Sequence, residues 1–421
     1  MIKGRLNPEG KGCDQMLTAV LDDGRLISLV SPEFSRTELN FLRQNGKFFC
    51  PVCHSPVLLK LGTRKRWHFS HKPENPCLIE SEPESAIHLA GKEDLFLWTS
   101  QNGRSPLLEH YLPSIHQRAD LFLPGIEPIA FEYQCSTLPE KKMAERTDGY
   151  QRMGINPVWI LGSTRFRKKG SLLKIAGFET EAIRYMPQQS SARFPFFSPY
   201  YLCYYQPGER RFCFAAQLYP ATETLFITRE INQPLQKIKP YQIIFPTFPV
   251  NQSSFKQQWL KLKKHQRLTP FVHGSETEYR LRIYAYRMKK NLTYFPAFVG
   301  LPHEDYVHLL SPPYLWQMWV CLIFQSQPGK RLFVENIIHG IENRGAGAIF
   351  TKRNLPLCPQ RSLNQMIRIY LNQLVFLRVL EKSEEGYRMH KSYLMRKEDS
   401  LERLLYEDQK VLDQLEKAYL I

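Results

Sequence analysis

The sequence has no apolar run of membrane-spanning length, no internal repeat and no long low-complexity tract. Its richest apolar stretch, residues 314–324, is too short to cross a bilayer and is expected to form a buried helix. The residues after Met1 are polar and basic, so we expect no secretory signal and a cytoplasmic location. The 9 cysteines are an odd number and several lie in apolar runs, as is typical of reduced thiols. These absences disfavour membrane proteins and secreted disulfide scaffolds.

Acidic residues are also in short supply. Asp and Glu total 40 against 57 Lys and Arg, which gives a formal net charge of +17 at pH 7. Such a charge attracts polyphosphates, because binding releases the counterions condensed on them. The chain of 421 residues is long enough for two or three domains with separate cores. A nucleic acid is therefore the expected class of partner.

Five Cys and His residues have the spacing of a structural zinc site. Structural zinc has four ligands in a tetrahedron, and a Cys-x-x-Cys pair followed after about fifteen residues by a second His/Cys pair is typical. Alternation along a strand would turn His68 and His71 to opposite faces, so both are not expected to bind one ion. We expect Cys50, Cys53, His71 and Cys77 to be the ligands, with His68 as the substitute. The alternative is a reduced Cys pair beside two surface histidines.

Two acidic residues on consecutive predicted strands form a candidate catalytic site. Asp120 and Glu132 are twelve residues apart, in segments that can pair as a hairpin, and Gln134 would share a face with Glu132. Phosphodiester cleavage suits a hard cation such as Mg²⁺, which is held by one or two carboxylates and keeps several waters. The alternative is that Asp120 ends a strand at a turn and that Glu132 is a solvated edge residue.

A helix is predicted upstream of these strands, from Glu84 to Trp98. It would place Glu84, His88 and Lys92 four residues apart on one face. This second polar stripe is positioned to close over the acidic site.

In the order and spacing of these motifs, the chain resembles the competence protein CoiA family of transformable Gram-positive bacteria. The motifs that carry the resemblance are Cys50-Pro51-Val52-Cys53 with Trp67-His68-Phe69-Ser70-His71, Glu84-Ser85-x-x-His88-x-x-x-Lys92, Arg118-Ala119-Asp120, Glu132-Tyr133-Gln134-Cys135-Ser136, and Tyr150 followed by Gly154-Ile155-x-Pro157-Val158-Trp159-Ile160-Leu161-Gly162. The match is good over residues 1–165 and looser at Trp316-Gln317. The resemblance implies a nuclease-like domain of the PD-(D/E)XK type that uses Mg²⁺ or Mn²⁺ and acts in recombination of incoming DNA.

One position departs from the PD-(D/E)XK pattern. The pattern ends in a Lys that orients the attacking water and stabilises charge on the phosphate, whereas this chain has Gln134. Glutamine donates a hydrogen bond but brings no charge. Lys92 can replace the missing cation if it reaches the site. The family that the chain resembles itself tends to have the Glu-x-Gln form.

We predict an α/β fold in three parts: a zinc-ribbon-like β module over residues 1–80, a mixed-sheet nuclease-like domain over residues 81–170, and a largely α-helical C-terminal domain over residues 190–421. Apolar runs around Asp23-Gly24 indicate a hairpin in the first part. In the second part we expect strands at 107–112, 118–123, 128–135 and 158–161 and a helix near 138–153.

Three functions agree with these patterns. The leading one is a metal-dependent deoxyribonuclease acting on single-stranded or branched DNA. In it, Asp120 and Glu132 bind the metal, Gln134 orients water, Glu84 is an additional acid, and Lys92 is the replacement cation. The second is a non-catalytic DNA-binding adaptor that recruits a recombinase of the RecA type. The third is a structural scaffold whose basic charge is incidental.

Two later stretches, residues 256–267 and 279–290, combine basic and aromatic residues. Their Lys and Arg residues can neutralise phosphates while their rings stack on bases. The alternative, which helical spacing favours, is a pair of amphipathic helices whose aromatics pack inward and whose basic residues are solvated.

Overall fold

The computed structural model describes residues 15–31, 33–63, 66–72, 74, 77, 85–187, 196–248, 252–269, 275–395 and 399–418. The chain divides into two compact units. Unit 1 contains Met1–Arg165, Cys203–Cys213 and Asn232–Ile244, and unit 2 contains Phe166–Leu202, Phe214–Ile231 and Phe245–Ile421. The predicted three-part division stays a prediction.

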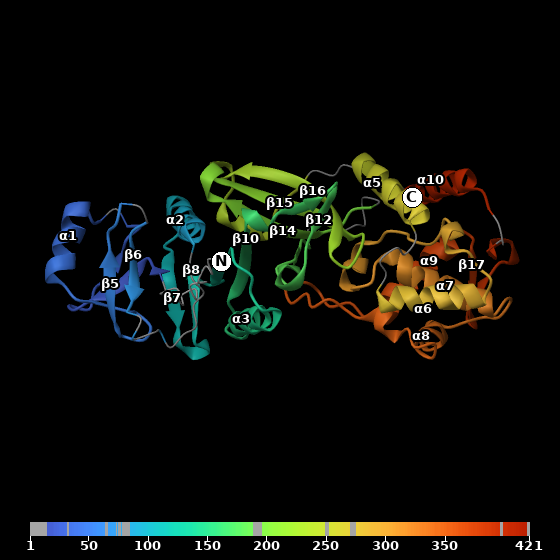
Figure 1. Ribbon diagram of the computed structural model, residues 1–421, viewed down its shortest axis with the longest axis horizontal. Helices are drawn as coiled ribbons and strands as arrows, with labels where there is room; N and C mark the ends of the chain where they lie inside the picture. The colour runs from blue at the N-terminus through green and yellow to red at the C-terminus, as the bar shows by residue number, and fades with distance from the viewer. Residues whose placement is uncertain are drawn as a thin grey trace, which may run out of the picture. The chain divides into compact units, whose positions relative to one another are not determined.

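An antiparallel sheet forms the N-terminal part of unit 1 (Figure 1). Its strands, in spatial order, are β1 (Gln15–Met16), β6 (His68–His71), β5 (Pro56–Lys60), β4 (Phe48–Phe49), β2 (Thr18–Leu21) and β3 (Leu26–Ser28). The predicted hairpin is confirmed, because β2 and β3 pair across a turn in which Gly24 has a φ of 84°. Helix α1 (Arg36–Asn45) begins at a capping box formed by Ser35 and Glu38. Buried apolar side chains of these elements form a separate core.

The rest of unit 1 contains a mixed sheet with an α-β-β-β-α-β order. The elements are α2 (Ala86–Gln101), β7 (Leu107–Leu112), β8 (Gln117–Leu123), β9 (Ile129–Gln134), α3 (Glu140–Arg152) and β10 (Asn156–Gly162). The first three strands are antiparallel, and β10 pairs with β9 in parallel. A parallel neighbour requires a crossover connection, which α3 provides. The elements predicted for this region are confirmed to within a few residues.

Helices α2 and α3 contact opposite faces of this sheet. Neighbouring side chains of a strand point to opposite faces, and on β9 Tyr133 contacts α2 while Glu132 contacts α3. A Cβ atom at Gly91 of α2 would lie 2.1 Å from the Tyr133 ring. A glycine inside a helix costs about 1 kcal/mol relative to alanine, and here it permits the close approach. His88 and Lys92 are thereby brought to the sheet.

Unit 2 is mostly helical and includes a small hairpin. Its helices are α5 (Gln252–Leu268), α6 (Glu276–Arg287), α7 (Pro313–Ser326), α8 (Val334–Glu342), α9 (Leu363–Phe376) and α10 (Leu401–Ala418), and the hairpin is β17 (Leu380–Ser383) with β18 (Gly386–Met389). The buried helix predicted for residues 314–324 is confirmed as α7, against which α6 and α8 pack (Figure 1). In the part of the chain that the structure describes, no helix is long and apolar enough to span a membrane.

The remaining strands and one short helix belong to one unit or are divided between the two. Strands β11 (Arg167–Lys169), β12 (Leu172–Lys174) and β13 (Arg184–Tyr185) belong to unit 2, and the short helix α4 (Pro240–Ile244) belongs to unit 1. The residues of β14 (Tyr200–Gln206), β15 (Arg211–Pro220) and β16 (Leu225–Pro234) are divided between the units. In unit 1, β14 extends the mixed sheet beside β10 through the parallel pairs Leu161↔Tyr204 and Gly162↔Tyr205.

Candidate metal centre and nuclease-like site

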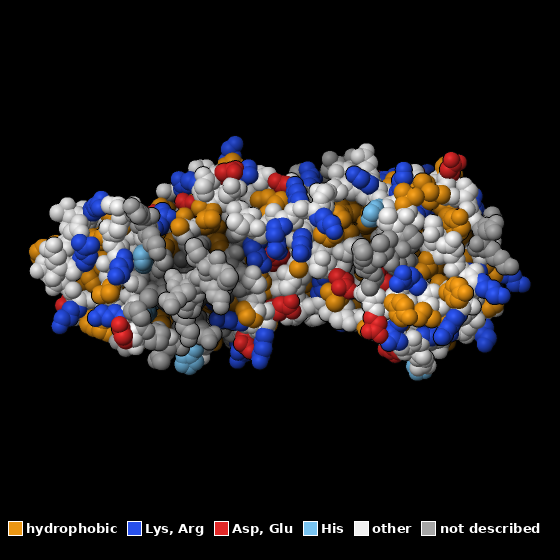
Figure 2. Space-filling model, viewed as in Figure 1, with side chains coloured by type: hydrophobic (Ala, Val, Ile, Leu, Met, Phe, Trp, Pro, Cys, Tyr) orange, Lys and Arg blue, Asp and Glu red, His pale blue; other side chains and the backbone are white. Residues whose placement is uncertain are grey.

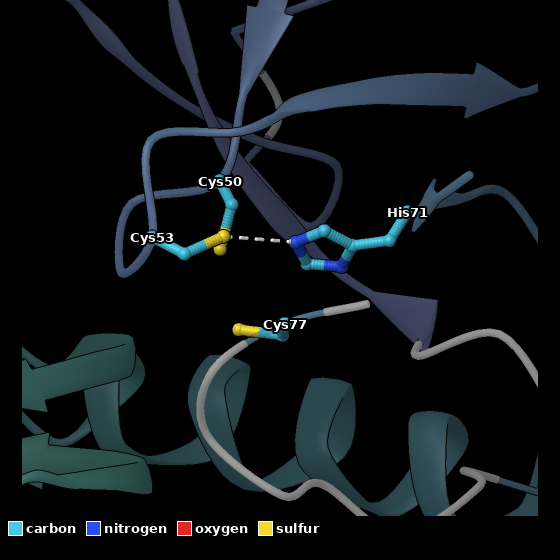
Figure 3. Close-up of side chains that lie close together, drawn as sticks. All are labelled: Cys50, Cys53, His71 and Cys77. Atoms are coloured by element: carbon cyan, nitrogen blue, oxygen red, sulfur yellow. Dashed lines mark hydrogen bonds between the residues drawn. The ribbon is translucent and has the colours of Figure 1, made fainter. Parts of the chain in front are cut away.

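Four of the five predicted zinc ligands lie together in unit 1 (Figure 3). One ligand atom from each of Cys50, Cys53, His71 and Cys77 lies within 4.8 Å of the other three. The closest contact with the ring is between Cys53 Sγ and His71 Nε2, at 3.3 Å. Among the residues that the structure describes, no other group of three or more Cys, His, Asp or Glu side chains is as close.

The N-terminal sheet brings these side chains together. Strand β4 ends immediately before Cys50, and the chain then turns tightly, with His54 N donating to Cys50 O at 3.0 Å. Val57 of β5 pairs with Phe48 on one side and His71 on the other. The end of β6 therefore lies level with the beginning of the Cys-x-x-Cys turn.

The electrostatics of this group favour a bound cation. The hydrogen bond with the Cys77 thiol and burial raise the pKa of Cys50 well above its usual range, so ionising this thiol without a nearby cation is costly. A metal ion would offset that cost, and three sulfurs with one imidazole nitrogen form a soft donor set. His68 lies outside the group, and its Nδ1 is 2.8 Å from the carbonyl oxygen of Arg66. The Cys/His cluster thus fits a metal ion.

Asp120 lies where β8 and β9 separate. Their last paired residues are Leu121 and Phe131, and Asp120 and Glu132 would form the next pair. Instead, Asp120 Oδ2 accepts a hydrogen bond of 2.9 Å from the backbone N–H of Tyr133. The Asp120 side chain is 18% exposed, and both of its carboxylate oxygens lie near basic or N–H groups of the protein.

Helix α2 supplies two basic partners for Asp120. His88 Nε2 lies 3.3 Å from Oδ2, and Lys92 Nζ lies 3.7 Å from Oδ1. Burial alone would raise the pKa of Asp120, but His88, Lys92 and the Tyr133 N–H outweigh it and hold the pKa well below its usual range. Asp120 is therefore ionised at neutral pH. Glu84, the third member of the predicted stripe, lies outside the described residues.

Lys92 has a second, closer acidic partner that the sequence did not reveal. Its Nζ is 2.5 Å from Oε1 of Glu109, and both side chains are almost completely buried. Glu109 Oε2 also accepts hydrogen bonds from Leu17 N, Thr18 N and the Thr18 hydroxyl, at 2.9, 3.1 and 2.9 Å. Glu109 thus links the N-terminal sheet to the nuclease-like part, and it balances the charge of Lys92.

Glu132 is bound by α3. Its Oε1 accepts hydrogen bonds from Arg146 Nη2, at 2.5 Å, and from the Tyr150 hydroxyl. Burial raises the pKa of Glu132 to about 7, because it disfavours the carboxylate by more than Arg146 stabilises it, and the charge of Asp120 adds to the increase. The cation beside the Glu-x-Gln motif is thus Arg146. In the sequence, the signal for this contact was the spacing of four residues between Arg146 and Tyr150 on the helix that follows the motif.

Gln134 follows Glu132 by two residues at the end of β9. Its Nε2 donates to the Ser136 carbonyl oxygen at 3.2 Å and to the Ser136 hydroxyl at 2.9 Å. The side chain therefore acts as a hydrogen-bond donor, as expected of glutamine. Its amide is directed toward the turn after β9, and the residue is only 7% exposed.

The first basic-aromatic stretch does not form the predicted DNA-contacting surface. Trp259 of α5 is 2% exposed, which confirms the inward-packing alternative for this ring. Lys263 and Arg267 are also buried, and each lies 2.8 Å from Asp408 of α10. The prediction that these two side chains contact phosphates is wrong, because both form buried ion pairs between α5 and α10. Lys261 and Lys264 are exposed.

Comparisons with known proteins agree with the order of these parts. The N-terminal domain of competence protein CoiA matches residues 32–80, its nuclease-like domain matches residues 84–248, and its C-terminal domain matches residues 255–414. Competence protein CoiA of Bacillus subtilis (strain 168) is 31% identical over 292 residues, which are 68% of this chain and 74% of the relative. No solved structure matches the chain.

Proposed function

Since the chain belongs to the CoiA family and carries its nuclease-like domain, we propose that it is a metal-dependent nuclease that processes incoming DNA during transformation. The observation that carries this proposal is the placement of Asp120 and Glu132 at the point where two adjacent strands separate. Asp120 is ionised and partly exposed, and Arg146 lies beside Glu132. These features supply the ligands and the positive charge that phosphodiester cleavage needs.

We propose Mg²⁺ or Mn²⁺ as the ion for these carboxylates, because such ions bind few protein oxygens and retain waters. When bound, such an ion polarises the phosphate and activates a water. Asp120 provides the ligand that stays ionised, and Glu132 becomes available as it loses its proton near pH 7. Arg146 stabilises negative charge on the phosphate, and Gln134 orients the water. Lys92 positions Asp120, and Glu84 remains the predicted additional acid.

We also propose zinc as the ion of the Cys/His cluster. Three thiolates and one imidazole are a usual structural zinc set, and no ligand position is left for substrate. The ion would therefore stabilise the N-terminal sheet and take no part in cleavage.

A second function is favoured by the contacts of Glu132 and Gln134. Both side chains already bind protein partners, Arg146 and Tyr150 in one case and Ser136 in the other. Side chains that already have hydrogen-bond partners are held in place, so this site can serve as a rigid DNA-binding surface that does not catalyse cleavage. The chain would then act as an adaptor that delivers DNA to a recombinase of the RecA type.

A cleavage assay distinguishes the two functions. The purified chain is incubated with single-stranded, duplex and branched DNA in the presence of Mg²⁺, Mn²⁺ or EDTA. We expect metal-dependent cleavage, and Asp120→Ala or Glu132→Ala should reduce it at least about 100-fold, because removing a ligand raises the barrier by several kcal/mol. Glu145→Gln is the matched control, since Glu145 lies on α3 and is 64% exposed.

The role of Arg146 has its own rescue test. Arg146→Gln should lower cleavage, and adding Gln134→Lys should restore part of it by returning a positive charge to the motif. Equal cleavage by wild type and Asp120→Ala would assign the activity to a contaminant or to another site. If neither protein cuts any substrate while both bind DNA, the adaptor function is correct.

A further inference from the structure

Helix α6 exposes two aromatic rings that its spacing suggested would pack inward. Tyr286 is 84% exposed and Tyr279 is 55% exposed. They are seven residues apart, so they lie on one line along the helix, separated by about 10 Å of rise. Figure 2 shows side chains of the hydrophobic class, which includes Tyr, next to basic ones over the position of α6 in Figure 1.

The inner face of α6 is complete without these rings. Leu281 and Ala285 are buried in the core of unit 2. Tyr284 stacks on Trp319 of α7, with ring centroids 5.2 Å apart and an interplanar angle of 16°, and the Arg344 guanidinium lies 4.9 Å from the Tyr284 ring. Packing therefore accounts for the inner aromatic residue of α6 and leaves the two outer ones unexplained.

Basic side chains flank the line of exposed rings. With 3.6 residues per turn, Arg282 falls on one side of the line and Arg287 on the other, and Lys289 follows just beyond the C-terminal end of the helix. All three are exposed, and the Arg282 guanidinium lies 6.0 Å from the Tyr279 ring.

We propose that this face of α6, formed by Tyr279, Arg282, Tyr286, Arg287 and Lys289, binds single-stranded nucleic acid. Exposed rings can stack on unpaired bases while Arg and Lys neutralise the adjoining phosphates. Duplex bases are stacked on one another and do not offer their faces. Tyr and Arg are also common at protein interfaces, but the basic flanks and the net charge of +17 favour a polyanion. This site goes beyond the proposed nuclease function and requires no cleavage by unit 1.

The test measures fluorescence anisotropy of a labelled oligothymidine and of a duplex of equal length with the full chain. The double variant Tyr279→Leu, Tyr286→Leu removes both rings and keeps apolar, helix-compatible side chains. We expect at least a tenfold loss of affinity for the single strand and little change for the duplex. Tyr406→Leu is the matched control, because Tyr406 lies on α10 and is 69% exposed.

A variant that lacks two of the basic side chains tests their contribution to binding in the same assay. Arg282→Gln, Lys289→Gln should weaken single-strand binding and reduce its salt dependence. Lys261→Gln, Lys264→Gln removes two exposed charges from α5 and should have a smaller effect. Photocrosslinking to an oligonucleotide that contains 5-iododeoxyuridine should place an adduct on Tyr279 or Tyr286.

Several results would overturn the proposal. These are unchanged single-strand affinity in the tyrosine variant, an equal loss on duplex, or an equal loss in the α5 variant. Loss of a protein partner with normal oligothymidine binding would assign the face to protein recognition instead. Binding is measured without added Mg²⁺ or Mn²⁺, so that no metal-dependent cleavage occurs and an inactive nuclease site leaves this test intact.

Discussion

The two candidate sites of unit 1 differ in how their charged groups are compensated. In the Cys/His cluster, three sulfurs and a ring nitrogen face one another, and the nearby Cys77 raises the pKa of Cys50. In the acidic site, Asp120 binds His88 and Lys92, while Glu132 binds Arg146 and Tyr150. The first site thus fits an external cation, whereas in the second the protein itself supplies the basic partners.

Removing the ion of the Cys/His cluster should have the largest effect. We expect Cys50→Ser, Cys53→Ser to lose one equivalent of zinc and to unfold the N-terminal sheet, since the binding free energy of structural zinc is also folding free energy. Metal content by mass spectrometry and limited proteolysis of residues 15–72 would measure both changes.

His68→Asn is the control for that experiment, because His68 lies outside the cluster and contacts the backbone at Arg66. It should retain the metal. Metal-replete wild type without zinc, or a Cys double variant as stable as wild type, would show that the cluster is no metal centre.

Removing the acidic partner of Lys92 should have the next largest effect on stability. Glu109→Gln leaves Lys92 buried without its closest acid, and breaking a buried ion pair in this way costs about 3–5 kcal/mol. Urea denaturation of unit 1 would measure the free energy of unfolding. Adding Lys92→Met should recover part of the loss, because it removes the uncompensated charge. A change below about 0.5 kcal/mol, the size expected for the exposed pair Lys141–Glu145, would contradict the prediction.

The smallest expected effect is a pH dependence from Glu132. The ordinary pKa of 4.5 rises to about 7 in the folded chain because of burial, so between these values only the folded state holds the proton. The free energy of unfolding should therefore fall as the pH rises from 4.5 to 7, by up to about 3 kcal/mol. The measured difference between wild type and Glu132→Gln isolates this titration. A difference of the opposite sign would show that Arg146 keeps Glu132 ionised.

Local patterns predicted the nuclease-like part of unit 1 and single elements elsewhere in the chain. The order from α2 to β10, the hairpin at Gly24 and the buried helix α7 depend on periodicity and turn residues that a short window contains. The spacing of the Cys and His residues also indicated the group that the structure brings together. A tight Cys-x-x-Cys turn fixes two of those positions before any distant contact forms.

The partners of the charged residues depended on tertiary structure. Glu109 and Thr18 are 91 residues apart, and Arg267 and Asp408 are 141 residues apart. No periodicity connects such pairs, because each arises only when separate elements pack together. Lys92 consequently binds Glu109 and Asp120, and the cation at Glu132 comes from α3.

The two basic-aromatic helices show the same difference between what the sequence indicates and what tertiary structure decides. The sequence by itself indicated that residues 256–267 and most of residues 279–290 are helical, and that both stretches are basic and aromatic. Only the tertiary structure decided that Trp259 of α5 is buried and that Tyr286 of α6 is exposed. Helical periodicity tells which residues share a face, whereas the neighbouring elements decide which face is covered. Burial is a property of that packing, and so the surface available for a partner could be found only in the folded chain.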